Sequence, residues 1–274
     1  MLRDETLAHF ARLIEALRPF LDRLVIVGGW APRLYRYRPD ALIPPYLPLF
    51  TRDADVAIPS DVALPASIRQ QLLAYGFDEE LRGEDRPPIT YYHLGTESAG
   101  FYAEFLTPLI GGGGRPGKPS QDTVEVGGVV AQKLRYLDLL MIEPWRVTPD
   151  EHPLDGRTDI TVPNAACYIA QKLLIGRKRA PENRAKDVLY IHDTIDLFGA
   201  SLEELQDLWQ TVRLRLPGRI AADVERLASD QSHAVIDALR GAVQVATKAG
   251  RDLTFETIQA VYEEGLSRIF GRPA

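Results

Sequence analysis

The sequence of 274 residues predicts an α+β fold, a mixed sheet followed by a helical bundle. Two observations lead to this prediction. Short apolar runs bounded by turn residues occur between residues 24 and 130, as in strands. From residue 164 onward, apolar residues recur at helical spacing. We place the boundary within 148–161, which gives domains 1–148 and 149–274.

In the N-terminal half, apolar spacing predicts a helix that leads into a sheet of about four or five strands. The proline-rich stretch Arg38–Leu49 cannot continue a helix and is expected to be an inserted loop. In chain order we expect helix Thr6–Leu17, strand Leu24–Val27, short helix Trp30–Tyr37, a strand from Asp53 to Ile58, helix Ser67–Tyr75, strands Ile89–Leu94, Gly100–Leu106 and Thr123–Val130, and helix Gln132–Ile142.

The C-terminal half reads as helices throughout. Asn164 and Ser201 are suited to cap helix starts, and Gly199 is suited to end a helix. The expected helical segments are Asn164–Arg179, Glu182–Phe198, Leu202–Arg215, Arg219–Ala246 and Phe255–Ile269.

The composition indicates a globular protein, with 45% hydrophobic and 26% charged residues and a net charge of −6. This charge argues against a broad basic surface for non-specific nucleic-acid binding, so any such partner must be held locally. Residues 1–20 lack the apolar core of a signal peptide, and no stretch is typical of a membrane span. The single cysteine, Cys167, cannot form an internal disulfide and fits a reducing compartment. We therefore expect a cytoplasmic protein without a membrane partner.

Three carboxylates form a candidate metal site. Asp53 and Asp55 are two residues apart on a predicted strand, so their side chains point to one face. Glu104 lies in a later apolar strand, on the face opposite Phe101 and Phe105. Carboxylate oxygens are ligands for hard divalent cations.

A glycine pair, Gly28-Gly29, ends the first predicted strand. Glycines at a strand end let a polyphosphate approach backbone N–H groups, close to the positive end of the following helix. Together with the three carboxylates, this turn suggests metal-assisted nucleotidyl transfer, in which the metal bridges triphosphate oxygens and stabilises the leaving pyrophosphate.

Basic residues in the helical half are candidates for contact with the nucleotide. Lys172 lies on an apolar helix, where a lysine without a partner is costly to bury. Arg177 and Lys178 begin a basic run that either is a solvated helix end or contacts a triphosphate or nucleic-acid acceptor. Asp187 follows, either as a functional group or as a partner for a nearby cation.

Two other site types are excluded. Residues 112–118 have the glycine and lysine spacing of a phosphate-binding loop, but Pro119 replaces the required serine or threonine and a strand follows instead of a helix. The five histidines show no zinc-type spacing.

The order Gly28-Gly29, Asp53-x-Asp55 and Glu104 resembles the polymerase-beta-like nucleotidyltransferase superfamily. Over residues 20–200 the chain is similar to uncharacterised bacterial GSU-type nucleotidyltransferase-fold proteins and, more distantly, to AbiEii and MenT type toxins. The runs that carry the closer resemblance are Phe101–Leu109, Arg135–Asp138 and Lys172–Arg179 with Lys186-Asp187.

This resemblance implies a transferase that uses an NTP with magnesium or manganese and an acceptor hydroxyl on an RNA end, a protein or a small molecule. It implies that Lys172 binds triphosphate and that Asp187 orients it or assists the hydroxyl. The toxins make tRNA the first macromolecular acceptor to consider, and a cognate antitoxin or regulator a partner. The alternative is an inactive nucleotide-binding or toxin–antitoxin interaction module.

The chain departs from the family pattern in one respect. The gap between Gly29 and Asp53 is longer than usual, and Arg38–Leu49 accounts for the excess. We expect this insertion to be a lid or an acceptor-recognition loop, or to displace the metal site.

Overall fold

The computed structural model describes residues 2–49, 51–83, 87–95, 100–110, 122–154 and 156–271. It divides into two compact units, the first comprising Met1–Leu34 and Phe50–Pro163, the second Tyr35–Leu49 and Asn164–Ala274. Our domains 1–148 and 149–274 stay a prediction. The glycine-rich segment 111–119 lies outside the described residues.

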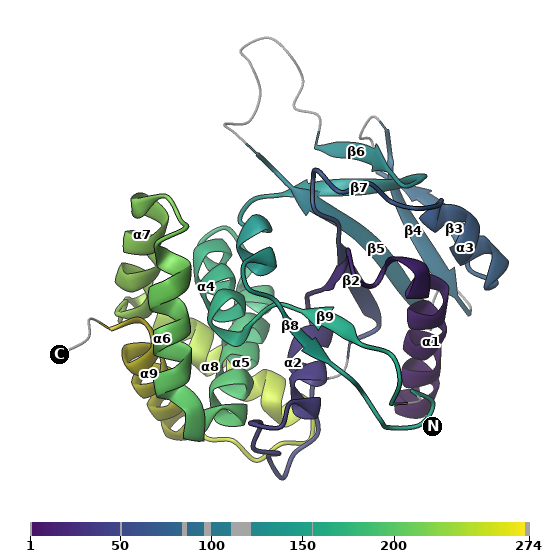
Figure 1. The fold of residues 1–274 in the computed structure, drawn as a ribbon. Coiled ribbons are helices and arrows are strands. Elements are labelled where there is room, and N and C mark those ends of the chain that lie inside the picture. The colour runs from purple at the N-terminus through teal and green to yellow at the C-terminus, as the bar shows by residue number, and fades with distance from the viewer. Residues whose placement is uncertain are drawn as a thin grey trace. The chain divides into compact units, whose positions relative to one another are not determined.

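The first unit is built on a mixed sheet, as predicted (Figure 1). Its strand order is β1-β2-β5-β4-β3, and β7 pairs with both β5 and β6. β2 and β7 each run parallel to β5, and the other pairs are antiparallel. The strands are β1 (Val25–Ile26), β2 (Asp53–Ala57), β3 (Asp78–Arg82), β4 (Ile89–Leu94), β5 (Phe101–Pro108), β6 (Thr123–Val126) and β7 (Val129–Leu134).

Helices of the first unit cover the apolar side of the sheet. α1 (Leu2–Leu17) contacts β5 and α3 (Ile68–Ala74), and both helices agree with the prediction. Ser67 caps α3 through its hydroxyl, which accepts from the Gln70 N–H. α2 (Trp30–Leu34) is a short helix, and Trp30 stacks on Phe10 at 3.7 Å between ring centroids.

The predicted helix over Gln132–Ile142 is wrong. Gln132 lies in β7, which forms a hairpin with β6 through Gly127 and Gly128. Both glycines have positive φ, 60° and 79°, as a tight two-residue hairpin turn requires. Pairing on two sides, with β6 and β5, overrides the helical spacing of the leucines that follow. Only Asp138–Met141 is helical, as a 3₁₀ turn.

The predicted strand count is also wrong, since the described sheet has seven strands where we expected four or five. β3 was missed because its sequence, Asp-Glu-Glu-Leu-Arg, shows no apolar alternation. Charged residues are typical of such edge strands, where they discourage pairing with other chains. A separate two-stranded sheet, β8 (Trp145–Val147) with β9 (Ile160–Val162), was missed as well.

The second unit is helical, as predicted. Asn164 caps α4 by accepting from the Cys167 N–H, whereas Ser201 makes no side-chain cap and Gly199 follows the end of α5. The segment expected around Arg219–Ala246 contains two helices. The helices are α4 (Ala165–Gly176), α5 (Pro181–Leu197), α6 (Leu202–Arg213), α7 (Gly218–Ala228), α8 (His233–Lys248) and α9 (Phe255–Phe270).

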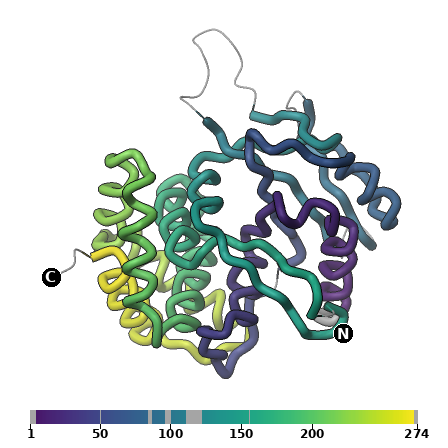
Figure 2. Tube along the Cα trace, in the orientation of Figure 1, coloured from purple at the N-terminus to yellow at the C-terminus, as the bar shows by residue number. Residues whose placement is uncertain are grey.

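The insertion Arg38–Leu49 contains no helix or strand and belongs to the helical unit, along whose end its trace runs in Figure 2. The Leu42 N–H donates to the Leu197 carbonyl at 2.7 Å. The Tyr46 hydroxyl donates to Asp196 Oδ2 at 2.6 Å, and Arg251 Nη2 donates to the Leu47 carbonyl at 2.6 Å. These bonds fix the insertion to the body of the second unit.

No helix in the described part of the chain is both long enough and apolar enough to cross a bilayer.

Candidate metal centre

Two adjacent parallel strands position the three carboxylates. In the register of β2 with β5, Asp55 lies opposite Glu104 and Asp53 lies opposite Tyr102. Because side chains alternate along a strand, Asp53, Asp55 and Glu104 share one face of the sheet. The residues between them, Ala54 and Ala103, are fully buried on the other face.

The structure brings the three carboxylates into ligand distance of one another. Each offers one oxygen, and the three oxygens all lie within 4.8 Å of one another. All three residues are partly exposed, so a solvated cation can reach them. Partly exposed carboxylate oxygens that converge in this way suit a hard divalent cation.

The pKa of Glu104 reflects burial and repulsion among the three carboxylates, and such a cation would reduce that repulsion. Burial, the charge of Asp55, a hydrogen bond with Asp55 and the charge of Asp53 raise the pKa of Glu104 to about 8. A hydrogen bond from Tyr91 has the opposite effect. Without a metal, Glu104 therefore tends to retain its proton near neutral pH. The donor set fits a divalent metal, because the metal would replace that proton and balance the remaining charge.

The glycine turn lies against this cluster. Gly28 has φ +62°, and a Cβ on it would lie 1.7 Å from Asp55 Oδ2. The Val27 N–H donates to the Asp55 carbonyl at 2.9 Å, which ties the turn to β2. The helix that follows Gly29 has only five residues, so its dipole adds little to an anion site.

Neighbouring side chains set the positions of two carboxylates. The Thr51 hydroxyl donates to Asp53 Oδ1. Tyr91, which lies opposite Glu104 in the pairing of β4 with β5, hydrogen-bonds to the Glu104 carboxyl group. The Tyr91 ring packs edge-on against Tyr102 at 5.5 Å between centroids. An aromatic pair therefore borders the carboxylates on the same face of the sheet.

A sequence model of the family described as "Nucleotidyltransferase" matches residues 5–213, most of the chain. The chain belongs to this family. The match covers the glycine turn, all three carboxylates and the helices α4 and α5.

Comparisons with solved structures and with curated proteins add less information about the family. The chain is similar in structure to a protein from H. pylori that is named only provisionally as a nucleotidyltransferase, with 12% sequence identity and a TM-score of 0.46. That match covers 97% of this chain and 95% of the other. No curated protein matches the chain.

In the second unit, Lys172 and Asp187 form a buried pair. Lys172 Nζ donates to Asp187 Oδ1 at 2.8 Å, and the two residues are 6% and 4% exposed. The ammonium group also lies 5.4 and 5.5 Å from the ring centroids of Tyr168 and Tyr190. Asp187 Oδ2 lies 3.0 Å from Arg179 Nε but without hydrogen-bond geometry. The charge of Lys172 is thus already balanced within its own unit.

Arg177 and Lys178 follow the end of α4 and are exposed. Neither side chain makes an ion pair with another described residue, and Arg177 lines a cavity of the second unit. Nucleotide binding by Lys172, Arg177, Lys178, Asp187, Gly28 and Gly29 stays a prediction.

Sequence reasoning missed two features of the site. Tyr91 lies in a recognisable strand, but the strand register that places it beside Glu104 leaves no mark in the sequence. Gly28 was singled out for its access to phosphate, whereas its close approach to Asp55 depends on the antiparallel pairing of β1 with β2.

Proposed function

We propose that this protein transfers a nucleoside monophosphate group from an NTP to an acceptor hydroxyl, with Asp53, Asp55 and Glu104 holding the divalent cation. The single observation that carries the proposal is the convergence of these three carboxylates within 4.8 Å in a chain of the nucleotidyltransferase family. When bound, magnesium or manganese would polarise the α-phosphate and stabilise the departing pyrophosphate.

At phosphorus the reaction forms one bond and breaks one. The acceptor oxygen attacks the α-phosphorus, the bond from that phosphorus to the pyrophosphate oxygen breaks, and pyrophosphate leaves with the bonding electrons. The acceptor hydroxyl loses its proton, and Glu104 is the group we assign as its general base. Hydrogen bonding from Tyr91 keeps the Glu104 carboxyl oriented during this exchange.

The family supports an NTP as the nucleotide, and the resemblance described above suggests the partners. We assign Gly28 and Gly29 to the phosphates through their backbone, and the acceptor hydroxyl to an RNA end, a protein side chain or a small molecule. Regulation by a cognate antitoxin remains a prediction.

Calorimetric titration of each NTP in the presence of magnesium tests the proposal. We expect one or more NTPs to bind to the wild type, and binding to be lost in Asp53→Asn with Asp55→Asn. Asp78→Asn is a matched control, because Asp78 is exposed in β3 of the same sheet and lies outside the carboxylate cluster. Equal binding by the wild type and the double variant would contradict the proposed site. Nucleotide binding without transfer to any of the three acceptor classes would instead support an inactive binding module.

A further inference from the structure

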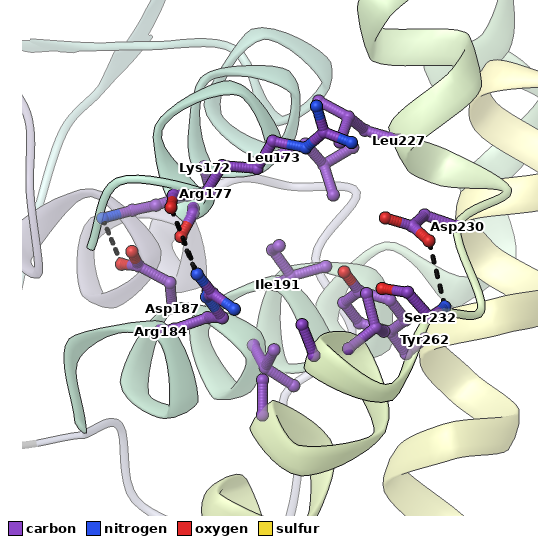
Figure 3. A pocket seen from close by; sticks show the side chains of 15 residues that line it. Lys172, Leu173, Arg177, Arg184, Asp187, Ile191, Leu227, Asp230, Ser232 and Tyr262 are labelled. Carbon is purple, nitrogen blue, oxygen red and sulfur yellow. Dashed lines mark hydrogen bonds and ion pairs between the residues drawn. The ribbon is translucent and has the colours of Figure 1, made fainter. Parts of the chain in front are cut away.

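The second unit contains a cavity of about 310 Å³, lined by residues of helices α4, α5, α7, α8 and α9 and the segments next to them (Figure 3). All of its lining residues belong to this unit, and none of the three carboxylates is among them. The volume is at the lower end of the range for small-molecule sites. Its walls are largely apolar, with Leu173, Val188, Ile191, Leu227, Val235 and Ala238.

Charged groups of opposite sign face each other across this cavity. Figure 3 shows the Arg177 guanidinium and the Asp230 carboxylate extending over it from two sides. No ion pair joins Arg177 to Asp230 or to any other residue that the structure describes. Asp230 Oδ1 accepts from the Ser232 N–H at 3.0 Å, which leaves Oδ2 for a ligand. Arg184 is held beside Arg177, with Nε donating to the Gly176 carbonyl at 2.9 Å.

The hydroxyl of Tyr262 marks the interior of the cavity. Tyr262 is only 6% exposed and lines the cavity wall, where Figure 3 shows its hydroxyl directed inward. Among the described residues this hydroxyl has no hydrogen-bond partner. The hydroxyl lies on the cavity wall and is therefore open to a hydrogen bond from a ligand or water.

We propose that this cavity binds a nucleoside monophosphate group. The apolar walls would hold the planar base, and its ring N–H and amino groups would donate to Asp230 and to the Tyr262 hydroxyl. The phosphate would lie at the guanidinium group of Arg177, since guanidinium groups favour phosphate oxygens. A ligand with hydrogen-bond donors at one end and an anion at the other matches the separated charges of Asp230 and Arg177.

A free mononucleotide and the terminal nucleotide of an RNA share this chemistry. The cavity goes beyond the proposed transfer reaction, because binding here needs none of Asp53, Asp55 and Glu104. Failure at one site can therefore be told apart from failure at the other.

The test is calorimetric titration of the full chain with GMP, AMP, CMP and UMP in EDTA, which removes divalent metal. Inorganic phosphate and a short single-stranded RNA with a 3′-terminal guanosine are parallel arms. We expect GMP to bind more tightly than UMP, because guanine offers two adjacent donors to a carboxylate, and phosphate alone to bind far more weakly. Tighter binding of the RNA than of GMP would assign the site to an RNA terminus, and the reverse to a free mononucleotide.

Two variants locate the binding. Tyr262→Phe keeps the ring and removes one hydrogen bond, so we expect roughly five- to tenfold weaker GMP binding. Arg177→Ala should weaken GMP binding by a similar or larger factor. Arg219→Ala, an exposed arginine of α7 outside the cavity, and Asp53→Asn should leave it unchanged. No mononucleotide or RNA binding in EDTA at millimolar concentration, or undiminished binding in both Tyr262→Phe and Arg177→Ala, would overturn the proposal.

Discussion

The carboxylate of Asp55 lies so close to Gly28 that no side chain fits at position 28. The Cβ of any other residue at Gly28 would fall 1.7 Å from Asp55 Oδ2, and the backbone there has φ +62°. The strand end that carries the glycine turn and the strand that carries Asp55 are antiparallel neighbours. The requirement for glycine at this position is therefore set by the Asp55 carboxylate as well as by the turn.

Gly28→Ala should weaken both metal binding and folding. The left-handed conformation alone costs a non-glycine residue about 1–2 kcal/mol, and the displaced Asp55 carboxylate adds to that. We expect the free energy of unfolding, measured by urea denaturation, to fall by about 2 kcal/mol or more, with loss of magnesium-dependent nucleotide binding. Gly199→Ala is the control, because a Cβ there meets no atom within 4 Å. Unchanged nucleotide binding in Gly28→Ala would show that the contact has no bearing on the site.

The pKa of Glu104 predicts how the stability of the metal-free protein changes with pH. The folded protein keeps a proton on Glu104 up to about pH 8, whereas the ordinary value is 4.5. Between these values the unfolded chain has released a proton that the folded chain retains. The free energy of unfolding should therefore fall as the pH rises from about 4.5 to 8 and level off above that.

Glu104→Gln should remove this pH-dependent fall in the free energy of unfolding. It should also raise the melting temperature of the metal-free protein at pH 8. The gain at pH 8 is on the order of 2–4 kcal/mol, since each pKa unit corresponds to about 1.4 kcal/mol. Thermal melts in EDTA at several pH values measure it. Glu125→Gln, an exposed change in β6, should behave like the wild type. A melting temperature of Glu104→Gln that still falls over this pH range would contradict the assigned titration.

The carboxylate cluster could be predicted from sequence because it depends on local rules. Asp53 and Asp55 share a face through strand alternation alone, and Glu104 follows the same alternation within an apolar strand. Convergence of the three carboxylates also requires that β2 and β5 be neighbours in the sheet. The family resemblance implied this pairing. The expected α+β fold holds for the same reason, since apolar periodicity marks most of the elements.

Features that depend on non-local pairing could not be predicted. Gln132 was expected in a helix because leucine spacing is visible in sequence, whereas pairing of β7 with β5 is not. The sequence does not decide whether Asp187 has a functional role or only pairs with a cation. In the structure Asp187 accepts a hydrogen bond from Lys172, which lies on a different helix. In each case a partner distant in sequence decides the environment.

Removal of Lys172 should reveal its contribution to stability. Loss of one member of a buried ion pair leaves the other charge uncompensated and costs about 3–5 kcal/mol. Because Arg179 remains near Asp187, we expect the lower end of this range for Lys172→Met in urea denaturation. The double variant Lys172→Met with Asp187→Leu should recover most of the loss. Failure of the double variant to recover stability would mean that the pair does more than balance its own charges.

The contacts of Tyr46 and Arg251 predict that the proline-rich insertion does not act as a free lid. Arg251 Nη1 contacts both oxygens of Asp193 at 2.9 and 2.8 Å, and its guanidinium lies 4.4 Å from the Tyr46 ring centroid. Tyr46→Phe removes the hydrogen bond to Asp196 and should lower the free energy of unfolding by about 1 kcal/mol.

The same variant should speed amide hydrogen exchange at the Leu42 N–H, which bonds to Leu197. Tyr75→Phe is the matched control, because Tyr75 is exposed at the end of α3. Rapid exchange at Leu42 in the wild type, equal to that in Tyr46→Phe, would show that the insertion opens freely. Slow exchange that Tyr46→Phe accelerates would mean that the insertion is anchored to α5, as its bonds to Leu197 and Asp196 indicate.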